Sequence, residues 1–263
     1  MNFSGIAGSG DRRRRIVTLL LVLVALTVAA VAAPAQRFGR RGRPEIQTVK
    51  VPYDGRFTFA RIRFTLTPEA GYDVKWAHDY PRAERHFMQL LRELTTLRPY
   101  MDGGTVVSLK DPELFRFPVA YFSEPGFWDM DDEEVAALRA YVEKGGFLIF
   151  DDFAGGHWYN FEWQMRRVLP NSRIVRLDTS HPIFDSFFRI ESLDYRHPYY
   201  NVASEFYGVF EDDDPSKRLV AIINYNNDIG DYWEFSDEGY FPVDLSNTAY
   251  KLGVNYVIYA MTH

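Results

Sequence analysis

The clearest pattern in the chain is a pair of short apolar runs on either side of an amphipathic helix. Residues 119–122 and 147–150 are continuously apolar, which is typical of strands buried on both faces of a parallel sheet. Between them, Asp131 and Glu134 stand at the spacing of a capping box, and apolar residues then recur at helical spacing. Two glycines supply a left-handed exit from this helix. We therefore predict a βαβ unit whose two strands are parallel neighbours.

The same periodicities predict further elements along the chain. Alternation of apolar and polar residues predicts a first strand over 57–66, and helical spacing predicts a helix that begins near Pro81 and a last helix from Asn247 onward. The other predicted elements are a strand over 105–109, a one-turn helix at 111–113, a helix over 161–169, a strand over 174–177 and a strand pair over 207–210 and 219–224. Residues 70–77, 155–158 and 226–233 are predicted loops, and the pattern assigns nothing to 191–207.

The first 35 residues have the pattern of a targeting segment. Arg12 to Arg15 form a positive region, residues 16–33 are apolar and uncharged, and Ala33-Pro34-Ala35 offers a cleavage site. The apolar run also reaches the length of a membrane span. The alternatives are therefore a cleaved signal peptide and an anchor in the inner membrane through residues 16–33. Both predict an exported, periplasmic or extracellular body, because the positive flank stays inside.

Charge divides the chain into two parts. Residues 1–54 carry nine Lys and Arg against three Asp and Glu, a net +6, and the whole chain carries −6, which leaves −12 for residues 55–263. We interpret the polar, basic residues 36–54 as a linker and residues 55–263 as a single α/β domain. The acidity of this domain argues against nucleic acid as a partner, and we expect membrane contact only through the N-terminal segment.

Composition limits the chemistry further. The chain has no cysteine, which excludes disulfides, thiolate catalysis, iron–sulfur clusters and cysteine zinc sites. With 46% hydrophobic residues, a domain of this size can build its core without such cross-links. We find no GxSxG, P-loop or GxGxxG motif, and the six histidines show no metal-binding spacing.

Polar residues gather where the predicted parallel strands end, which is where open α/β sheets bind their ligands. Four segments contribute: residues 78–79, 123–124, 151–152 and 226–233. The candidate catalytic residues are Asp151, Asp152 and Glu124. The ligand-binding candidates are Asp79, His157, Asn227, Asp228, Asp231 and Trp233.

The adjacent acids Asp151 and Asp152 have a functional and a structural interpretation. Side chains alternate along a strand, so one acid could reach a cleft while the other caps a helix or meets an arginine. With Glu124, an acid in the cleft could divide acid and base roles or hold a metal. In the structural alternative, the acids hold a loop and pair with Arg82 and Arg85.

The 226–233 segment also allows two interpretations. Asn227, Asp228 and Asp231 offer hard oxygen ligands, so a divalent cation is one alternative, although the segment lacks the spacing of an EF-hand. Turn chemistry of asparagine and aspartate is the other. Trp233 could cover this loop as a lid or belong to the core. We predict no cofactor beyond this optional cation.

Several runs of the sequence resemble a bacterial family called domain of unknown function 4159. The runs are DYPRAERHFMQLLRELTTL, LKDPELFRFPVAYFSEPG, EEVAALRAYVEKGGFLIFDDF, HPIFDSFF, NDIGDYWEF and AYKLGVNYVIYAMTH. The resemblance covers residues 55–263 and implies a class I glutamine amidotransferase-like fold, a flavodoxin-like three-layer sandwich with a mostly parallel central sheet. Such enzymes carry a cysteine nucleophile after a central strand, where this chain has Asp151 and Asp152, so amidotransferase activity is excluded.

We therefore expect an exported, non-catalytic binding or interaction domain on a degenerate amidotransferase-like fold. Some members of the family are longer membrane proteins thought to accompany MoxR-type ATPases and von Willebrand factor A-like proteins, so the resemblance also implies a protein partner in the cell envelope. The alternative is a carboxylate- or metal-dependent hydrolase of the cell envelope, acting on a substrate such as carbohydrate.

Overall fold

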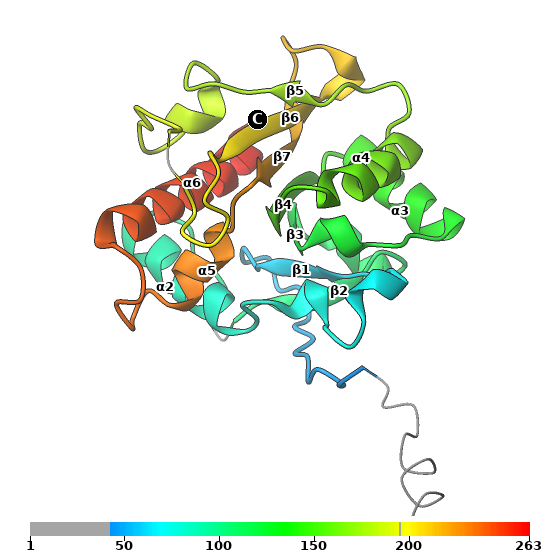
Figure 1. Cartoon of the computed structure of the whole chain (residues 1–263), viewed down its shortest axis with the longest axis horizontal. Helices are drawn as coiled ribbons and strands as arrows, with labels where there is room; N and C mark the ends of the chain where they lie inside the picture. The colour runs from blue at the N-terminus through cyan, green and yellow to red at the C-terminus, as the bar shows by residue number, and fades with distance from the viewer. Residues whose placement is uncertain (1–42, 102, 195) are drawn as a thin grey trace, which may run out of the picture. The chain divides into compact units, whose positions relative to one another are not determined.

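The apolar runs assemble into one seven-stranded sheet with helices on both faces (Figure 1). The computed structural model describes residues 43–263 apart from 102 and 195. The predicted targeting segment and residues 36–42 of the predicted linker lie outside this part of the chain. The strands are β1 (Ala60–Arg63), β2 (Thr105–Ser108), β3 (Val119–Ser123), β4 (Phe147–Phe153), β5 (Val175–Arg176), β6 (Glu205–Phe210) and β7 (Leu219–Tyr225).

The strand order is β2-β1-β3-β4-β7-β6-β5. Strands β2, β1, β3, β4 and β7 run parallel, whereas β6 is antiparallel to β7 and β5 is antiparallel to β6. The mostly parallel sheet and the β6–β7 strand pair are as the sequence predicts. The carboxyl ends of the parallel strands share one edge, called the carboxyl edge below.

Helices cover both faces of the sheet. They are α2 (Arg82–Leu94), α3 (Asp132–Glu143), α4 (His157–Val168), α5 (Ile229–Glu234) and α6 (Val243–Thr262). Short 3₁₀ helices lie at Pro68–Ala70, Lys75–Ala77, Pro112–Arg116, Pro125–Phe127, Pro182–Asp185 and Glu211–Asp213. Helices α3 and α4 pack on one face, and α2, α5 and α6 pack on the other (Figure 1). The arrangement fits a three-layer α/β fold.

Strand β4 shows why both faces must be covered. Phe150 lies with its ring 5.0 Å from that of Phe161 in α4, whereas Phe147 lies 6.0 Å from Tyr259 in α6. Successive side chains of a strand point to opposite faces, so a continuous apolar run needs an apolar partner on each. This confirms the interpretation of residues 147–150 as a strand buried on both faces.

The predicted βαβ unit is also confirmed. Strands β3 and β4 are parallel, with Val119 opposite Phe147. At the start of α3, the Glu134 amide donates to Asp131 Oδ1 at 2.9 Å and the Asp131 amide donates to Glu134 Oε2 at 3.0 Å, which is a capping box. Gly145 has φ of 98°, the left-handed conformation expected after the helix.

Several predicted boundaries were wrong. Residues 226–233 are not simply a loop, because Asp228 caps the short helix α5. Helix α4 begins at His157 rather than near 161, and α6 begins at Val243 rather than at Asn247. The first strand is confined to Ala60–Arg63. Short helices and helix starts carry weak periodicity, so their limits depend on caps and tertiary contacts.

Part of the predicted linker belongs to the domain. The compact unit runs from Pro44 to His263. The Val106 amide of β2 donates to the Val49 carbonyl at 3.1 Å, and the Val51 amide donates to Thr105 Oγ1 at 3.1 Å. Val51 is only 4% exposed. The domain therefore starts before residue 55, whereas composition predicts that it starts at residue 55.

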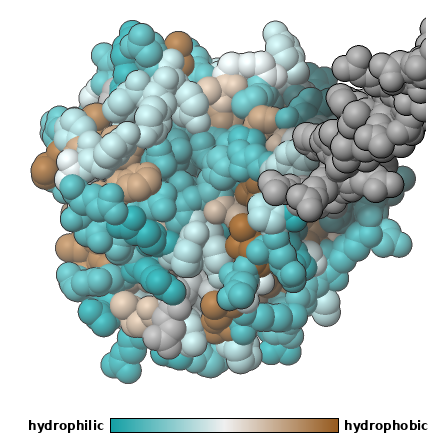
Figure 2. Space-filling model, turned by 60° about the horizontal axis from the view of Figure 1, so that its bottom comes forward, coloured by the Kyte–Doolittle hydropathy of each residue, from teal (hydrophilic) through white to brown (hydrophobic). Residues whose placement is uncertain are grey.

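The surface is largely polar on the face shown in Figure 2, where hydrophobic residues occur in small separate groups. No helix within the described part of the chain is both long enough and apolar enough to cross a bilayer.

Candidate functional site

The end of β4 is irregular, and the irregularity separates the two aspartates. The pairing of β4 with β7 shifts register between Phe150 and Phe153. Asp152 has φ of 62°, so it lies in the left-handed region that non-glycine residues seldom occupy. Both acids belong to the strand itself rather than to the loop that follows it.

Asp151 anchors helix α5. It accepts hydrogen bonds from the amides of Ile229 and Gly230, both at 3.0 Å, from Tyr121 Oη at 2.8 Å and from Asn224 Nδ2 at 3.1 Å. Burial raises the pKa of Asp151 to about 7, although the hydrogen bond from Tyr121 opposes this. The side chain is fully buried and its oxygens are engaged, so Asp151 acts as an anchor and does not face a ligand.

Asp152 lies instead among polar side chains from several loops. Its carboxylate accepts a hydrogen bond from Tyr200 Oη at 2.9 Å and one from Ser123 Oγ at 3.3 Å. Burial raises the pKa of Tyr200, which keeps its hydroxyl protonated as a donor. Asp152 is therefore the acid of the pair that faces the carboxyl edge.

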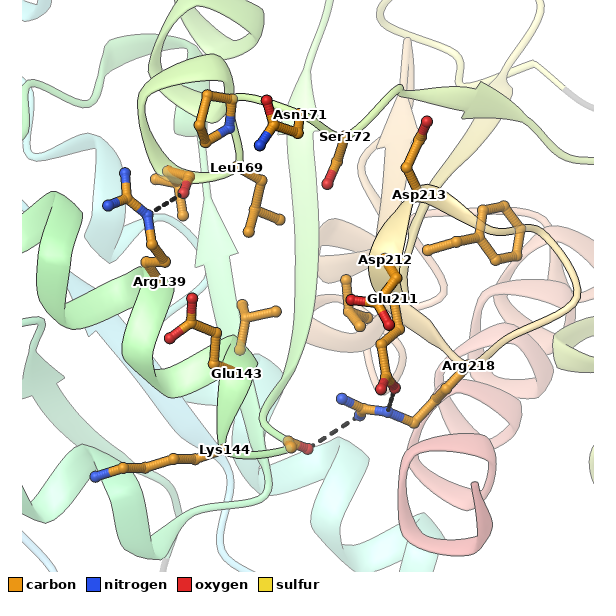
Figure 3. A pocket seen from close by; sticks show the side chains of 16 residues that line it. Arg139, Glu143, Lys144, Leu169, Asn171, Ser172, Glu211, Asp212, Asp213 and Arg218 are labelled. Carbon is orange, nitrogen blue, oxygen red and sulfur yellow. Dashed lines mark hydrogen bonds and ion pairs between the residues drawn. The ribbon is translucent and has the colours of Figure 1, made fainter.

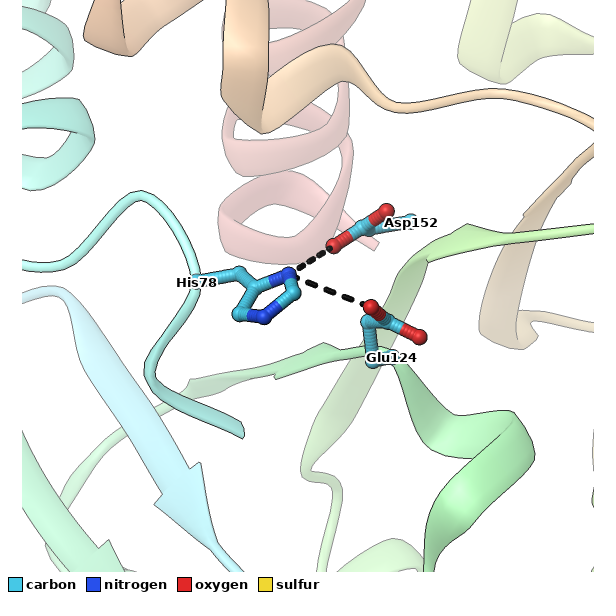
Figure 4. Close-up of side chains that lie close together, drawn as sticks. All are labelled: His78, Glu124 and Asp152. Atoms are coloured by element: carbon cyan, nitrogen blue, oxygen red, sulfur yellow. Dashed lines mark ion pairs between the residues drawn. The ribbon is translucent and has the colours of Figure 1, made fainter. Parts of the chain in front are cut away.

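Glu124 and His78 join Asp152 in an ion-paired group (Figure 4). His78 Nδ1 lies 3.1 Å from Glu124 Oε1 and 3.5 Å from Asp152 Oδ2, and Lys75 Nζ lies 2.9 Å from Glu124 Oε1. Burial alone would lower the pKa of His78, but hydrogen bonds to Asp152 and Glu124 outweigh it and raise the pKa to about 11. His78 is therefore an imidazolium that neutralises part of the acidic charge.

A second group of acids extends from Asp152 towards α5. Carboxylate oxygens of Asp79, Asp152 and Asp228 lie within 4.8 Å of one another, and so do those of Asp79, Asp231 and Glu234. Burial, reinforced by the charge of Asp152, raises the pKa of both Asp79 and Asp228 well above the usual range. The same causes raise the pKa of Asp231 to about 6. These acids therefore hold their protons more tightly than free carboxyl groups do, and a cation that bound here would take the place of those protons.

Buried polar atoms without a hydrogen-bond partner among the described residues include Arg61 Nη2 and Tyr232 Oη beside this region and two atoms within it. One is Asp79 Oδ2, on a residue that is 8% exposed. The other is Nε2 of the fully buried His197, whose nearest ion-pair contact is Asp231 Oδ2 at 3.9 Å. Buried polar atoms are nearly always paired, so each exception calls for an explanation.

The backbone is strained at the same edge. The residues there with left-handed φ are Asp79 (64°), Glu124 (50°), Asp152 (62°) and Asn226 (56°). Non-glycine residues held in this conformation cluster at functional sites, where the surrounding structure must hold them in place. Strain and buried charge thus coincide at the ends of β3, β4 and β7.

Three predicted site residues do not take part in this cluster. The ring of His157, the first residue of α4, packs 4.4 Å from the ring of Phe127. Trp233 is 1% exposed and stacks on Phe87 at 4.5 Å, so it belongs to the core and is not a lid. Asn227 is buried, and its Oδ1 accepts from the Asp228 amide at 3.0 Å, as a turn residue does.

The predicted pairing of Arg82 and Arg85 with Asp151 and Asp152 was wrong, since no ion pair between these residues occurs in the described part of the chain. Arg82 pairs with Asp237 at 2.7 Å and with Glu238 at 2.6 Å, away from the strand-end acids. The arginine near the site is Arg61 of β1, which is fully buried, pairs with Glu84 and donates to the His78 carbonyl at 2.8 Å. Sequence reasoning missed it because an arginine in an alternating strand normally points to solvent.

Reasoning from the sequence also missed Lys75, Tyr200 and His197. Tyr200 and His197 lie in the segment that showed no periodicity. The dense run of histidine and tyrosine at 197–200 was the available signal, since such side chains combine an apolar body with a polar end.

A separate hollow lies away from the carboxyl edge. It has a volume of about 940 Å³ and lies between the start of β4 and the β6–β7 turn (Figure 3). Its arginines are already engaged: Arg139 donates to the Val168 carbonyl at 2.7 Å, and Arg218 donates to the Gly145 carbonyl at 3.0 Å. It contains no predicted site residue, so the carboxyl edge remains the candidate site.

Fold and site together define an α/β domain with buried carboxylates at the carboxyl edge of its sheet. The sequence model of the family described as "Domain of unknown function (DUF4159)" matches residues 58–261, and the chain belongs to this family. This confirms the family resemblance of the sequence. No curated protein matches the chain.

Proposed function

We propose that this protein is an exported, non-catalytic domain that binds a positively charged ligand at the carboxyl edge of its sheet. The observation that carries the proposal is the convergence of Asp79, Asp152 and Asp228 within 4.8 Å of one another. Like charges repel strongly in a medium of low dielectric constant, and a bound cation relieves that repulsion. Export is supported by the pattern of residues 1–35, and a protein partner in the cell envelope remains part of the proposal.

The strand order supports the placement of the site. We propose a flavodoxin-like, amidotransferase-like fold, because the parallel strands β2-β1-β3-β4-β7 follow the order 2-1-3-4-5 of that class. Such folds bind ligands where the order reverses, which here is between β1 and β3. Glu124 follows β3, and the chain after β1 leads to His78 and Asp79, so both sides of this point contribute to the cluster.

Thermal unfolding tests the proposal. The full chain should be stabilised by at least one member of a panel that contains Mg²⁺, Mn²⁺, Ca²⁺ and the organic cation spermidine, because a ligand that binds only the folded state raises its stability. Asp152→Asn should remove this stabilisation. Asp129→Asn, which changes an exposed aspartate on the loop before α3, is the matched control. Equal stabilisation of all three proteins, or none in the native chain, would contradict the proposal.

A hydrolase is the second candidate, and one observation favours it. His78 Nδ1 stands between Glu124 and Asp152, so a histidine and two carboxylates, the groups that serve as general acids and bases, meet at one place. Chromogenic glycosides and esters test this candidate. Turnover that disappears in His78→Gln would support it, and turnover by the native chain no higher than by that variant would eliminate it for these substrates.

A further inference from the structure

The positively charged ligand can be narrowed to one chemical class. We propose that the carboxyl edge binds a hard divalent cation, such as Mg²⁺, Mn²⁺ or Ca²⁺, through carboxylate oxygens of Asp79, Asp152 and Asp228. The inference rests on the proposed function and restricts its ligand from any cation to a metal ion with oxygen ligands.

The geometry of the three carboxylates suits one ion. They come from three segments, the entry to α2, the end of β4 and the cap of α5, and their oxygens lie within 4.8 Å of one another. Because Mg²⁺ and Ca²⁺ bind oxygen at about 2.0–2.6 Å, oxygens on opposite sides of one ion are separated by about 4–5 Å. The three residues are also 8%, 4% and 6% exposed, so little water competes for their oxygens.

Asp79 Oδ2 gives an independent indication of a ligand. This oxygen is buried and has no hydrogen-bond donor among the described residues, and the carboxyl group nearest to hydrogen bonding with Asp79 is another acid, Asp231. Its position is fixed by close packing, since a Cβ on Gly230 would lie only 2.3 Å from it. A carboxylate oxygen fixed in a desolvated place without a donor is costly unless a proton or a cation satisfies it.

Neither histidine of the region offers a suitable nitrogen ligand. His78 contacts Asp73 through Nε2 and Glu124 through Nδ1, so both nitrogens are engaged with acids. His197 Nδ1 accepts from the Tyr199 amide at 3.4 Å, which leaves the ring proton on Nε2, the atom nearest Asp231. The available ligands are therefore oxygens, which Mg²⁺, Mn²⁺ and Ca²⁺ prefer, whereas zinc sites usually include nitrogen or sulfur.

The charges around the three ligands favour an ion as well. Asp231 and Glu234 carry further carboxyl groups within 4.8 Å of Asp79. On the other side of Asp152, Lys75 and His78 pair with Glu124 and Asp73, and His78 Nδ1 also lies 3.5 Å from Asp152 Oδ2. Burial and the neighbouring acids raise the pKa of Asp79 more than the charge of Arg61, which pairs with Glu84, lowers it. Side chains therefore compensate the acids of this group only in part, and a divalent ion would complete the compensation.

Calorimetric titration of the full chain with MnCl₂, combined with pulsed electron paramagnetic resonance of the bound Mn²⁺, tests the inference. We expect one Mn²⁺ per chain, no coupling to a directly bound ¹⁴N nucleus, and competition by Mg²⁺ or Ca²⁺. Asp79→Asn and Asp152→Asn should each weaken Mn²⁺ binding tenfold or more, and Asp129→Asn should leave it unchanged. Gly230→Ala should also weaken binding, because it retains every carboxylate but displaces Asp79.

The outcomes separate this inference from the proposed function. Stabilisation by spermidine that depends on Asp152, without any metal binding, would overturn the metal inference and leave the proposed function standing. Failure of all these cations to bind would overturn both. A strong ¹⁴N coupling, or Mn²⁺ binding that both aspartate variants retain, would refute the assigned ligands. The stoichiometry and the nitrogen coupling are measured on the native chain, so these results stand even if a variant fails to fold.

Discussion

The buried ion pair between Arg61 and Glu84 gives a sharp test of how the site is held in place. Both side chains are 0% exposed, and Arg61 Nη1 also donates to the carbonyls of Trp76 at 3.1 Å and His78 at 2.8 Å. Arg61 thus connects β1 and α2 to the loop that carries His78 and Asp79. Removing either member of the pair should weaken both the fold and the site.

The expected magnitude follows from the contacts. Glu84→Gln leaves the buried guanidinium without its counter-ion, and breaking a buried pair in this way destabilises a protein by about 3–5 kcal/mol. Arg61→Met also removes the donors to two carbonyls, each worth about 1 kcal/mol, so it should be the more damaging change. Arg61→Met with Glu84→Leu should cost less than the sum of the two single changes, because neither charge is then left unpaired.

Urea unfolding at pH 7, followed by circular dichroism, measures these differences. For a domain of this size, about 3–5 kcal/mol corresponds to a fall in Tm of about 6–20 °C. Glu93→Gln, on the exposed side of the same helix, is the control and should change stability by no more than about 0.5 kcal/mol. A loss below about 1 kcal/mol in Glu84→Gln would refute the view that this pair is desolvated and structurally important.

Three further predictions follow from other contacts. Without added metal, stability should fall from pH 5 to pH 8. Burial first, and the charge of Asp152 second, raise the pKa of Asp231 to about 6, so its contribution to stability is lost as pH rises through that value. The pKa of folded His78 is raised to about 11 against the effect of burial, so the folded state keeps a proton that the unfolded chain gives up above pH 6.5, and this contribution also decreases as pH rises. Urea midpoints that rise over this range would contradict this. Gly126→Ala should cost about 1–3 kcal/mol, since its Cβ would lie 2.4 Å from His157 Cβ, and an unchanged Tm would refute the close contact. Asp131→Ala should cost about 1 kcal/mol through loss of the capping box, which a urea titration would detect.

The elements that could be predicted are those whose signals are local. The capping box at Asp131 and Glu134, the left-handed glycine at 145 and the two apolar runs all lie within residues 119–150, and together they specify the β3-α3-β4 unit. Local propensity, apolar pattern and caps all agree there, and such agreement is what makes a segment predictable. The prediction that the candidate site lies at the carboxyl edge was based on the two parallel strands of the same unit.

The remaining features depend on contacts between distant residues. Arg61 and Glu84 are separated by 23 positions, and their pairing inside the protein is visible only once β1 and α2 are packed together. His197 and Tyr200 reach the site from a segment without regular structure, so no periodicity could place them. Strand alternation alone could not orient Asp152 either, because its left-handed φ breaks the period of two.

The two neighbouring aspartates at the end of β4 have different roles in forming the acidic cluster. Asp151 binds the amides of Ile229 and Gly230, and this fixes the first turn of α5 against the sheet. Asp228 caps that same turn through the Asp231 amide at 2.9 Å, so its carboxylate is positioned by the contact that Asp151 makes. The left-handed turn at Asp152 then directs the second acid towards Asp228. One aspartate therefore assembles the acidic cluster to which its neighbour contributes.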